Sequence, residues 1–333
     1  MPKIIFDGKH LDSNEGESVL DTLIRNDIDV PYSCKAGVCQ TCMMRCTSES
    51  IPPASQQELK PNLQKQGYFL SCKCNPENDM HVELTDSNKL YVSAELISKQ
   101  QLSPTVFCLR LQTATPLYYH AGQFINIKRT DGIIRSYSLA SLPSEDNFLE
   151  LHIKRMENGV MSNWLADEFE VGDSIKIEGP IGDCFYCSES SEQPILLVAS
   201  GTGLAPLIGI VRDALHNKHD GPIYLYHGAY NNEELYLDKE LKILTAKHGN
   251  VHYKSCITGA IPEETVLKGR ACDIALSDHP KLNGWQIYIC GAPSMVKFMQ
   301  QRVYMAGASL QNIHTDPFET KDLRKESRDN TPK

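Results

Sequence analysis

Four cysteines near the N-terminus constrain this chain more than any other feature of its sequence. They are Cys34, Cys39, Cys42 and Cys72, separated by four, two and 29 residues. Four thiolates at this plant-type spacing hold the two irons of a [2Fe–2S] cluster. Because such a cluster accepts one electron at a time, the pattern predicts an electron-transfer domain built around this loop.

A structural zinc site and a set of inert buried thiols are the alternatives for these cysteines. Zinc sites ordinarily combine two Cys-x2-Cys pairs, or one such pair with two histidines. Here only Cys39 and Cys42 form such a pair. The stretch 31–42 is polar, as expected of a loop whose amides approach sulfur ligands. The 29-residue interval favours Cys72 as the fourth ligand, with Cys74 as its competitor.

Composition limits the class of protein. The chain has 333 residues, enough for two or three domains, and a net charge of −9 without a Lys/Arg-rich tract, so we expect no nucleic-acid partner. No apolar run approaches the roughly 18 residues of a membrane span, and the first residues resemble no signal peptide, so we expect a soluble protein without membrane insertion. Twelve cysteines in such a chain indicate a reducing, cytoplasmic compartment.

Periodicity divides the chain into three predicted domains and a tail. Residues 1–88 form a β-rich unit with one short helix, ending in a linker at 85–88. Residues 89–188 show short strands interrupted by one helix at 162–168, which predicts an antiparallel barrel or sandwich. Residues 189–320 alternate strands with helices, among them 233–247, which predicts an open parallel sheet. The charged segment 321–333 predicts a disordered tail.

Three short motifs indicate a nucleotide ligand. Gly201-Thr202-Gly203 falls between a predicted strand and helix, where amides and the helix dipole favour phosphate, although an ordinary tight turn is the alternative. Arg135 and Tyr137 share one face of a strand, which suits a pyrophosphate joined to a ring system, or else a core tyrosine beside a solvated arginine. The segment 158–162 precedes the barrel helix, whose first amides would hold more of the pyrophosphate, unless Ser162 is simply an N-cap.

Taken in order, these motifs resemble the ferredoxin–NAD(P)+ reductase family in the version with an N-terminal plant-type ferredoxin domain. The resemblance extends to about Phe318. It implies a multidomain α+β and α/β fold with a β-grasp ferredoxin domain, an antiparallel β-barrel flavin domain and a C-terminal open parallel α/β nucleotide domain. Reductase components of multicomponent oxygenases and reductases of 3-deoxysugar formation are built this way. The motifs are the four cysteines, Arg135-Ser136-Tyr137-Ser138, Gly159-Val160-Met161-Ser162, Gly201-Thr202-Gly203-Leu204-Ala205-Pro206 and Cys290-Gly291-Ala292-Pro293.

The resemblance also implies roles for single residues. Arg135 would pair with the flavin pyrophosphate, Tyr137 would pack on the isoalloxazine ring and Ser138 would lie near its N5. Cys290 would lie beside the nicotinamide, which makes Ser138 and Cys290 the catalytic candidates, and Phe318 would lie near the flavin. The other cofactor-binding candidates are Ser136 for the flavin strand, Gly159, Val160, Met161 and Ser162 for the pyrophosphate, Gly201, Thr202 and Gly203 for the dinucleotide, and Gly291 for the nicotinamide.

A nicotinamide donor and a one-electron cluster in one chain require a converter between them. Nicotinamide gives up two electrons as a hydride, and a flavin accepts two electrons and releases them singly. We therefore expect a path from NAD(P)H through FAD to [2Fe–2S] and on to an external protein, most simply the oxygenase component of a multicomponent oxygenase. A deoxysugar-forming dehydratase, a stand-alone ferredoxin or flavin reductase, and a zinc-binding interaction module are the alternatives.

The choice of dinucleotide depends on the segment after the second strand of the nucleotide domain. A 2′-phosphate needs an Arg or Lys there, and Gly228-Ala229-Tyr230-Asn231-Asn232-Glu233-Glu234 offers none. The segment favours NADH, whereas Lys254 leaves NADPH open. FAD is favoured over FMN because 159–162 resembles the FAD-type pyrophosphate loop, and the resemblance implies a monomer.

Overall fold

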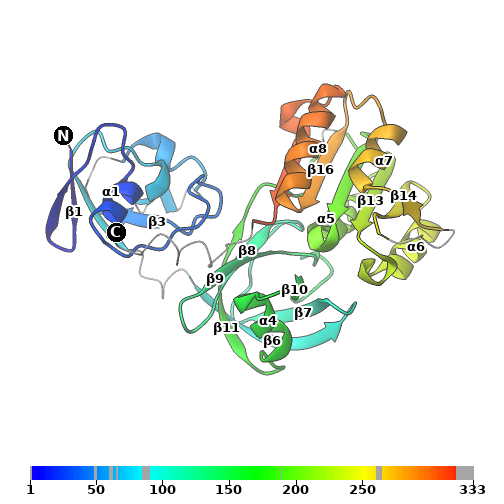
Figure 1. Ribbon diagram of the computed structural model, residues 1–333, viewed down its shortest axis with the longest axis horizontal. Coiled ribbons are helices and arrows are strands. Elements are labelled where there is room, and N and C mark those ends of the chain that lie inside the picture. Colours follow the sequence, from blue (N-terminus) through cyan, green and yellow to red (C-terminus); the bar gives the residue numbers. More distant parts are fainter. Residues whose placement is uncertain are drawn as a thin grey trace. The chain divides into compact units, whose positions relative to one another are not determined.

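The computed structural model describes residues 2–48, 51–59, 63–64, 67–84, 91–188, 190–259 and 265–319. The chain forms two compact units, Met1–Tyr91 and Val92–Lys333 (Figure 1). The expected linker at 85–88 and the expected tail at 321–333 lie outside the described residues.

The first unit is a mixed five-stranded sheet packed with one α-helix. Its elements are β1 (Lys3–Phe6), β2 (Lys9–Asp12), α1 (Val19–Arg25), β3 (Met43–Cys46), β4 (Tyr68–Leu70) and β5 (Met80–Leu84). The order is β2-β1-β5-β3-β4, with β1 and β5 parallel and the other neighbours antiparallel. The Ser18 hydroxyl caps α1 by accepting a hydrogen bond from the Asp21 amide, and Leu20 and Leu23 enter the core. This is the expected β-grasp arrangement.

The second unit begins with six antiparallel strands that close into a barrel. They are β6 (Val92–Gln101), β7 (Val106–Thr113), β8 (Phe124–Lys128), β9 (Ile134–Ser138), β10 (Leu149–Lys154) and β11 (Ser174–Ile181). Their order is β10-β7-β6-β11-β8-β9, and a bridge from Leu139 to Leu151 joins the two ends. Helix α4 (Val160–Asp167) contributes Leu165 to the barrel core.

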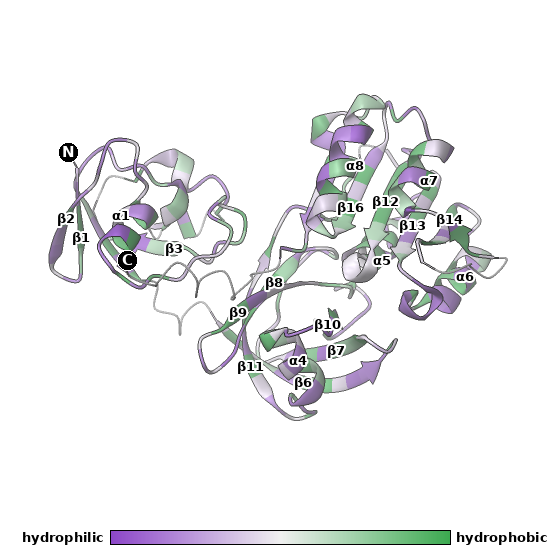
Figure 2. Cartoon of the chain, in the orientation of Figure 1, coloured by the Kyte–Doolittle hydropathy of each residue, from purple (hydrophilic) through white to green (hydrophobic). Residues whose placement is uncertain are grey.

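The rest of the second unit is a six-stranded parallel sheet covered by helices on both faces. The strands are β12 (Ile195–Ser200), β13 (Ile223–Ala229), β14 (Val251–Ile257), β15 (Leu267–Lys268), β16 (Gln286–Gly291) and β17 (Ile313–Pro317), and the helices are α5 (Leu204–His216), α6 (Asp238–Lys247), α7 (Ala271–Asp278) and α8 (Pro293–Met305). The order is β15-β14-β13-β12-β16-β17. Leu207 of α5 and Leu241 of α6 share one core, whereas Ala275 of α7 and Met299 of α8 share the opposite one. The central strands of this sheet, which lie between the two cores, are correspondingly hydrophobic (Figure 2).

Three predicted elements differ from the structure in their bounds. The barrel helix begins at Val160 rather than at residue 162, so Ser162 is not its N-cap. Helix α6 begins at Asp238 rather than at residue 233, because the Asn231 side chain caps a separate 3-10 turn, Asn232–Glu234. The sequence pattern also predicts a strand at 136–140, and the structure has this strand at Ile134–Ser138. Helix α7 and strand β17 were not predicted.

The barrel and the parallel sheet pack against each other within the second unit. Arg212 of α5 binds Asp146 of the barrel domain at 2.7 Å, and Lys154 of β10 lies 3.5 Å from Glu234. The approach is close at Gly209, where a Cβ atom would lie 3.2 Å from the Ala140 carbonyl oxygen. The interface therefore brings the flavin motifs beside the strand ends of the sheet.

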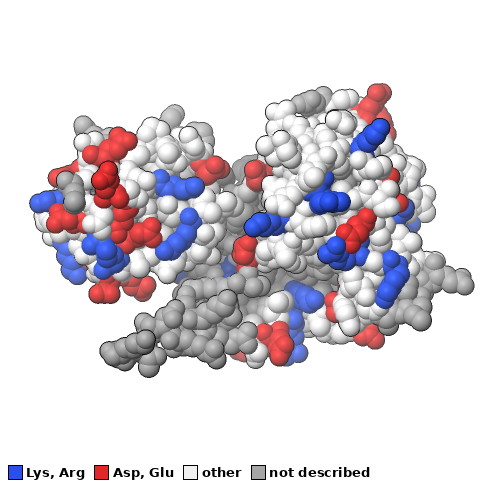
Figure 3. Space-filling model, turned by 45° about the horizontal axis from the view of Figure 1, so that its top comes forward, with Lys and Arg blue, Asp and Glu red and all other residues white. Residues whose placement is uncertain are grey.

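The surface shows charges of both signs. Acidic and basic side chains are interspersed over the face of the molecule seen in Figure 3. Among the described residues, no helix combines the length and the apolar character needed to cross a bilayer.

Candidate redox centres

The predicted ligands of the cluster lie together in the first unit as two pairs of sulfur atoms. The Cys39 amide donates to the Cys34 sulfur at 3.4 Å, and the Cys34 amide donates to the Cys39 sulfur at 3.5 Å. The Cys42 and Cys72 sulfurs are 3.2 Å apart. Two pairs of thiolates are the donor set that two irons require, so the residues fit the cluster.

The backbone of the loop turns its amides toward these sulfurs. Lys35, Gly37 and Gln40 all have positive φ, at 52°, 86° and 55°. The Ala36 amide donates to the Cys34 sulfur at 3.3 Å. Amide donors of this kind stabilise thiolate charge, and the left-handed conformations at Lys35, Gly37 and Gln40 shape the loop that supplies them.

Each pair of sulfurs holds one thiol of lowered pKa. The hydrogen bond from Cys39 lowers the pKa of Cys34 to about 4, and the hydrogen bond from Cys42 lowers the pKa of Cys72 to about 7. Cys74 differs, because it is fully buried in the domain core with its sulfur 3.7 Å from that of Met80. The geometry therefore groups Cys72 with the loop and Cys74 with the core.

The flavin motif lies on β9 at the edge of the barrel. Tyr137 is half-buried, packs against the barrel core and has its pKa raised by burial. Arg135 shares its face of the strand, as predicted, and donates to the Ile134 carbonyl at 2.7 Å. Ser136 points to the other face, where its hydroxyl donates to the Asn126 side chain at 2.7 Å.

The start of α4 is shaped by Gly159. A Cβ atom at this position would lie 2.2 Å from the Ser162 hydroxyl, which accepts a hydrogen bond from the Met156 amide at 3.2 Å. Gly159 is the N-cap residue and supplies no side-chain cap, so the first amides of the helix remain for an anion. Val160 is exposed and Met161 is buried in the core. This cradle fits a pyrophosphate.

The glycine turn at the end of β12 is a 3-10 turn, Gly201–Gly203, that leads into α5. Gly201 has φ +54°, and a Cβ atom there would meet nothing within 4 Å, so this side of the turn is open. A Cβ atom at Gly203 would lie 2.1 Å from the Cys290 carbonyl oxygen, and one at Gly291 would lie 2.4 Å from the Ser200 hydroxyl. The turn is therefore packed against β16 on one side and free for a dinucleotide on the other.

The flavin strand and the nucleotide sheet meet at Ser138. Its hydroxyl donates to a carboxylate oxygen of Asp316 at 2.6 Å, and Asp316 is the β17 residue paired with Cys290 on β16. Burial raises the pKa of Asp316 to about 6, against the opposing effect of the Ser138 hydrogen bond. The Cys290 thiol is fully buried, 3.7 Å from the Cys184 sulfur, and burial raises its pKa.

Asp316 and Cys184 were missed as site residues by sequence reasoning. The one signal in the sequence for Asp316 was its position two residues before Phe318, because the strand that pairs it with Cys290 was not predicted. The Phe318 amide donates to the Gly291 carbonyl at 2.8 Å, which fixes the half-buried Phe318 at this strand end.

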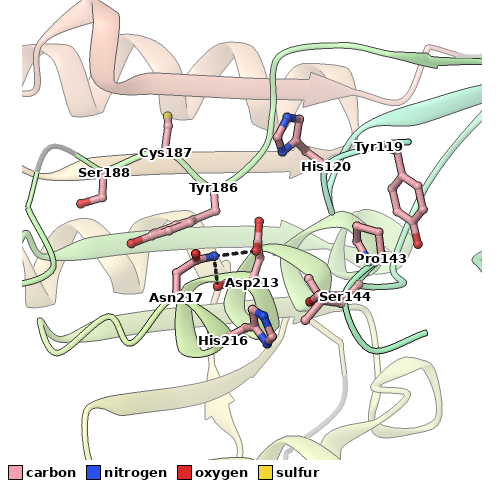
Figure 4. Close-up of a pocket in the computed structure, with 11 residues that line it drawn as sticks. Tyr119, His120, Pro143, Ser144, Tyr186, Cys187, Ser188, Asp213, His216 and Asn217 are labelled. Carbon is pink, nitrogen blue, oxygen red and sulfur yellow. Dashed lines mark hydrogen bonds between the residues drawn. The ribbon is translucent and has the colours of Figure 1, made fainter. Parts of the chain in front are cut away.

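Two other features lie apart from these motifs. A cavity of about 520 Å³ is lined by residues such as His120, Tyr186 and Asp213 (Figure 4). It lies at the far end of the 13-residue α5, about 20 Å from the glycine turn. Cys108, Glu150 and His152 bring three metal-ligating atoms within 4.8 Å of one another, but Arg110 already binds Glu150 at 2.8 Å.

Comparison with known proteins decides the family. Models of a 2Fe-2S iron-sulfur cluster binding domain, an oxidoreductase FAD-binding domain and an oxidoreductase NAD-binding domain match residues 4–77, 93–186 and 197–301. The ferredoxin–NAD(P)+ reductase component of the naphthalene 1,2-dioxygenase/salicylate 5-hydroxylase systems of Ralstonia sp is 32% identical over 315 residues, covering 93% of this chain and 95% of that protein. This chain belongs to the ferredoxin–NAD(P)+ reductase family.

Other relatives extend the match along the whole reductase. The CDP-6-deoxy-L-threo-D-glycero-4-hexulose-3-dehydrase reductase of Yersinia pestis is 29% identical, covering 92% of this chain and 94% of that protein. The crystal structure of an Amycolatopsis cytochrome P450 reductase has a TM-score of 0.70 and 27% identity, covering 96% of this chain and 99% of the other. The reductase is an NAD(P)H-dependent flavin iron–sulfur oxidoreductase with [2Fe–2S], FAD and NAD(P) sites, and the zinc-module alternative is wrong.

Proposed function

We propose that this reductase delivers electrons from NADH, through FAD and the [2Fe–2S] cluster, to the oxygenase component of a multicomponent oxygenase. The observation that carries the proposal is the hydrogen bond between Ser138 and Asp316, at 2.6 Å. It joins the flavin strand of the barrel to the strand ends of the nucleotide sheet. A flavin on β9 and a nicotinamide above β16 would therefore meet where these two residues lie.

The proposal assigns binding residues to each of the three cofactors. Cys34, Cys39, Cys42 and Cys72 hold the cluster. Arg135 and the first turn of α4 bind the flavin pyrophosphate, and Tyr137 packs on the flavin ring. The open side of the Gly201–Gly203 turn receives the dinucleotide. When bound, FAD accepts two electrons as a hydride and releases them one at a time.

The protein side chains position groups instead of performing acid–base chemistry. Because the Ser138 hydroxyl donates to Asp316, its oxygen lone pairs are left to accept a hydrogen bond from the flavin edge. Cys290 supports the nicotinamide site by packing, since its thiol is buried and its carbonyl contacts Gly203. Phe318, held at the Gly291 carbonyl, shields the same edge from water.

The names of the relatives support the choice of electron acceptor. The Ralstonia protein serves a dioxygenase and a hydroxylase, which favours an oxygenase, whereas the Yersinia protein serves a deoxysugar dehydrase and makes such an enzyme the second candidate. The test is to reduce the holoprotein anaerobically with NADH and mix it rapidly with each purified candidate acceptor. Reoxidation of the cluster at a rate that saturates with oxygenase concentration is expected. Reoxidation by the dehydrase alone would contradict the proposal.

The preference for NADH is supported by the contacts that Lys254 makes. The Lys254 ammonium binds Asp278 at 2.7 Å and lies over the Tyr226 ring. Because Lys254 is already paired with a carboxylate, it is a poor partner for a 2′-phosphate. The Asn231 side chain caps the following turn, in which Glu233 and Glu234 are acidic. We expect kcat/KM for NADH to exceed that for NADPH by about tenfold or more, measured at steady state with an artificial acceptor.

The remaining assignments of the chain are proposals of the same kind. We place the ferredoxin domain at 1–88, the flavin domain at 89–188, the nucleotide domain at 189–320 and the tail at 321–333. We propose a monomer. We also propose that it is cytoplasmic, since none of the twelve cysteines forms a disulfide, as expected in a reducing compartment.

A further inference from the structure

A fully buried histidine lies directly beneath the glycine turn. His227 of β13 has no exposed surface, and its Nε2 is 3.1 Å from the carbonyl oxygen of Gly201. Because a carbonyl only accepts, Nε2 must carry the proton and donate it. The other ring nitrogen, Nδ1, has no hydrogen-bond partner among the described residues. Burial lowers the pKa of His227 to about 4, which keeps the ring neutral.

This hydrogen bond fixes the direction of a peptide group. In a planar trans peptide, the carbonyl of one residue and the amide N–H of the next point in opposite directions. The Gly201 carbonyl points toward His227 and also accepts from the Leu204 amide. The Thr202 amide therefore points away from His227. A Cβ atom at Gly201 would meet nothing within 4 Å, so the turn has open space beside this residue.

The histidine ring is itself held by Tyr236, which in turn contacts the flavin barrel. Tyr236 meets His227 edge-on, with ring centroids 5.6 Å apart and planes at 84°. The Tyr236 hydroxyl lies 3.2 Å from Nδ1 of His152 on β10, whose Nε2 faces Glu150 at the same distance. Tyr236 and His152 are also buried, so this column of side chains is enclosed between the barrel and the sheet.

We propose that His227 is a positioning residue for the dinucleotide. Its ring N–H holds the Gly201 carbonyl inward and so presents the Thr202 amide to the pyrophosphate of NADH, while Tyr236 fixes the ring from the barrel side. This role rests on the proposed function only in assigning the Gly201–Gly203 turn to the dinucleotide. An ordinary core histidine would have no effect on dinucleotide affinity beyond its effect on stability.

The test measures binding of NAD+ to the oxidised holoprotein by calorimetry, with FAD content and melting temperature recorded for each variant. His227→Gln retains a donor near the position of Nε2, whereas His227→Asn is too short and His227→Phe has none. We expect H227N and H227F to bind NAD+ about tenfold more weakly and H227Q to stay within about threefold of wild type. The KM for NADH should rise in the same order, with kcat nearly constant.

Two control variants separate the possible failures. His219→Phe alters another buried histidine with one unpartnered ring nitrogen, at the other end of α5, and should leave NAD+ affinity unchanged. Gly201→Ala adds a methyl group on the open side of the turn and should weaken binding. Wild-type affinity in H227N and H227F, with G201A weakened, would overturn the role of His227 alone. If G201A also bound normally, the proposed dinucleotide seat would itself be wrong. Equal weakening in H227Q and H227N would show a merely structural effect and overturn the proposal.

Discussion

Ser138 and Asp316 are separated by 178 residues in the chain, yet their side chains share a hydrogen bond of 2.6 Å. Because burial raises the pKa of Asp316 to about 6, the folded protein keeps this proton at pH values where the unfolded chain has lost it. The contribution of Asp316 to the free energy of unfolding is therefore fully present below about pH 4 and is lost as the pH rises to about 6.

Asp316→Asn removes this titration. The stability advantage of the wild type over D316N should shrink by about 2 kcal/mol between pH 4.5 and 7, measured by urea unfolding. Asp278→Asn is the matched control. Burial raises the pKa of Asp278, but hydrogen bonds from Lys254 and Tyr226 outweigh it and lower this pKa. The stability advantage of the wild type over D278N should therefore stay constant between pH 4.5 and 7. Parallel pH profiles for the two variants would contradict the burial of Asp316.

Cys290→Ser tests whether Cys290 supports the proposed nicotinamide site. Gly203 packs on the Cys290 carbonyl, so a change in this buried side chain shifts the floor of the dinucleotide turn. Flavin reduction by NADH should slow by about tenfold or more in stopped-flow experiments, with FAD content unchanged, because hydride transfer is sensitive to small misplacements. An unchanged rate would remove Cys290 from the site.

Short elements carry most of the residues that we propose for cofactor binding, and each element depends on a few backbone positions. The cluster loop uses three residues of positive φ to aim its amides, and α4 begins at a glycine that leaves its first amides uncapped. Such features are local in sequence, so a single substitution can disrupt each of them.

The cluster loop gives a paired test. Cys72→Ser should abolish the visible spectrum of the cluster, because the Cys72 sulfur lies 3.2 Å from that of Cys42. Cys74→Ser should retain the spectrum, because Cys74 is buried in the core and directed to Met80. The opposite result would exchange the two residues as ligands.

The start of α4 gives a second test. Gly159→Ala places a methyl group on the Ser162 hydroxyl and should weaken FAD affinity by about tenfold or more, measured by fluorescence of released flavin. Gly249→Ala, where a Cβ atom meets nothing within 4 Å, is the control and should retain FAD. Normal FAD binding by G159A would place the pyrophosphate elsewhere.

Elements specified by their own residues could be predicted, and those specified by distant contacts could not. The cysteine loop and the glycine turn depend on near neighbours and were recognised. The start of α6 was wrong because a helical pattern does not show that Asn231 caps a separate turn. Asp316, Cys184 and His227 escaped notice as site residues, since their partners come from other strands and, for Asp316, from another domain.

The molecule as a whole combines a two-electron donor site and a one-electron outlet in one chain. Within the second unit, Arg212, Lys154 and Ser138 each bind an acidic partner across the contact between the barrel and the sheet. This interface keeps the flavin strand beside the nucleotide turn. The first unit matches the 2Fe-2S cluster binding domain and carries the four cysteines that we propose as ligands of this one-electron centre.

Anaerobic titration with NADH tests this division of labour most directly. In the wild type, each NADH should supply two electrons, and both the flavin and the cluster signals should be lost before the titration ends. In Cys72→Ser, reduction should stop when the flavin alone is reduced, after one NADH per protein. Reduction of the cluster by NADH in protein stripped of FAD would contradict the account, because electrons would then reach the cluster without the flavin.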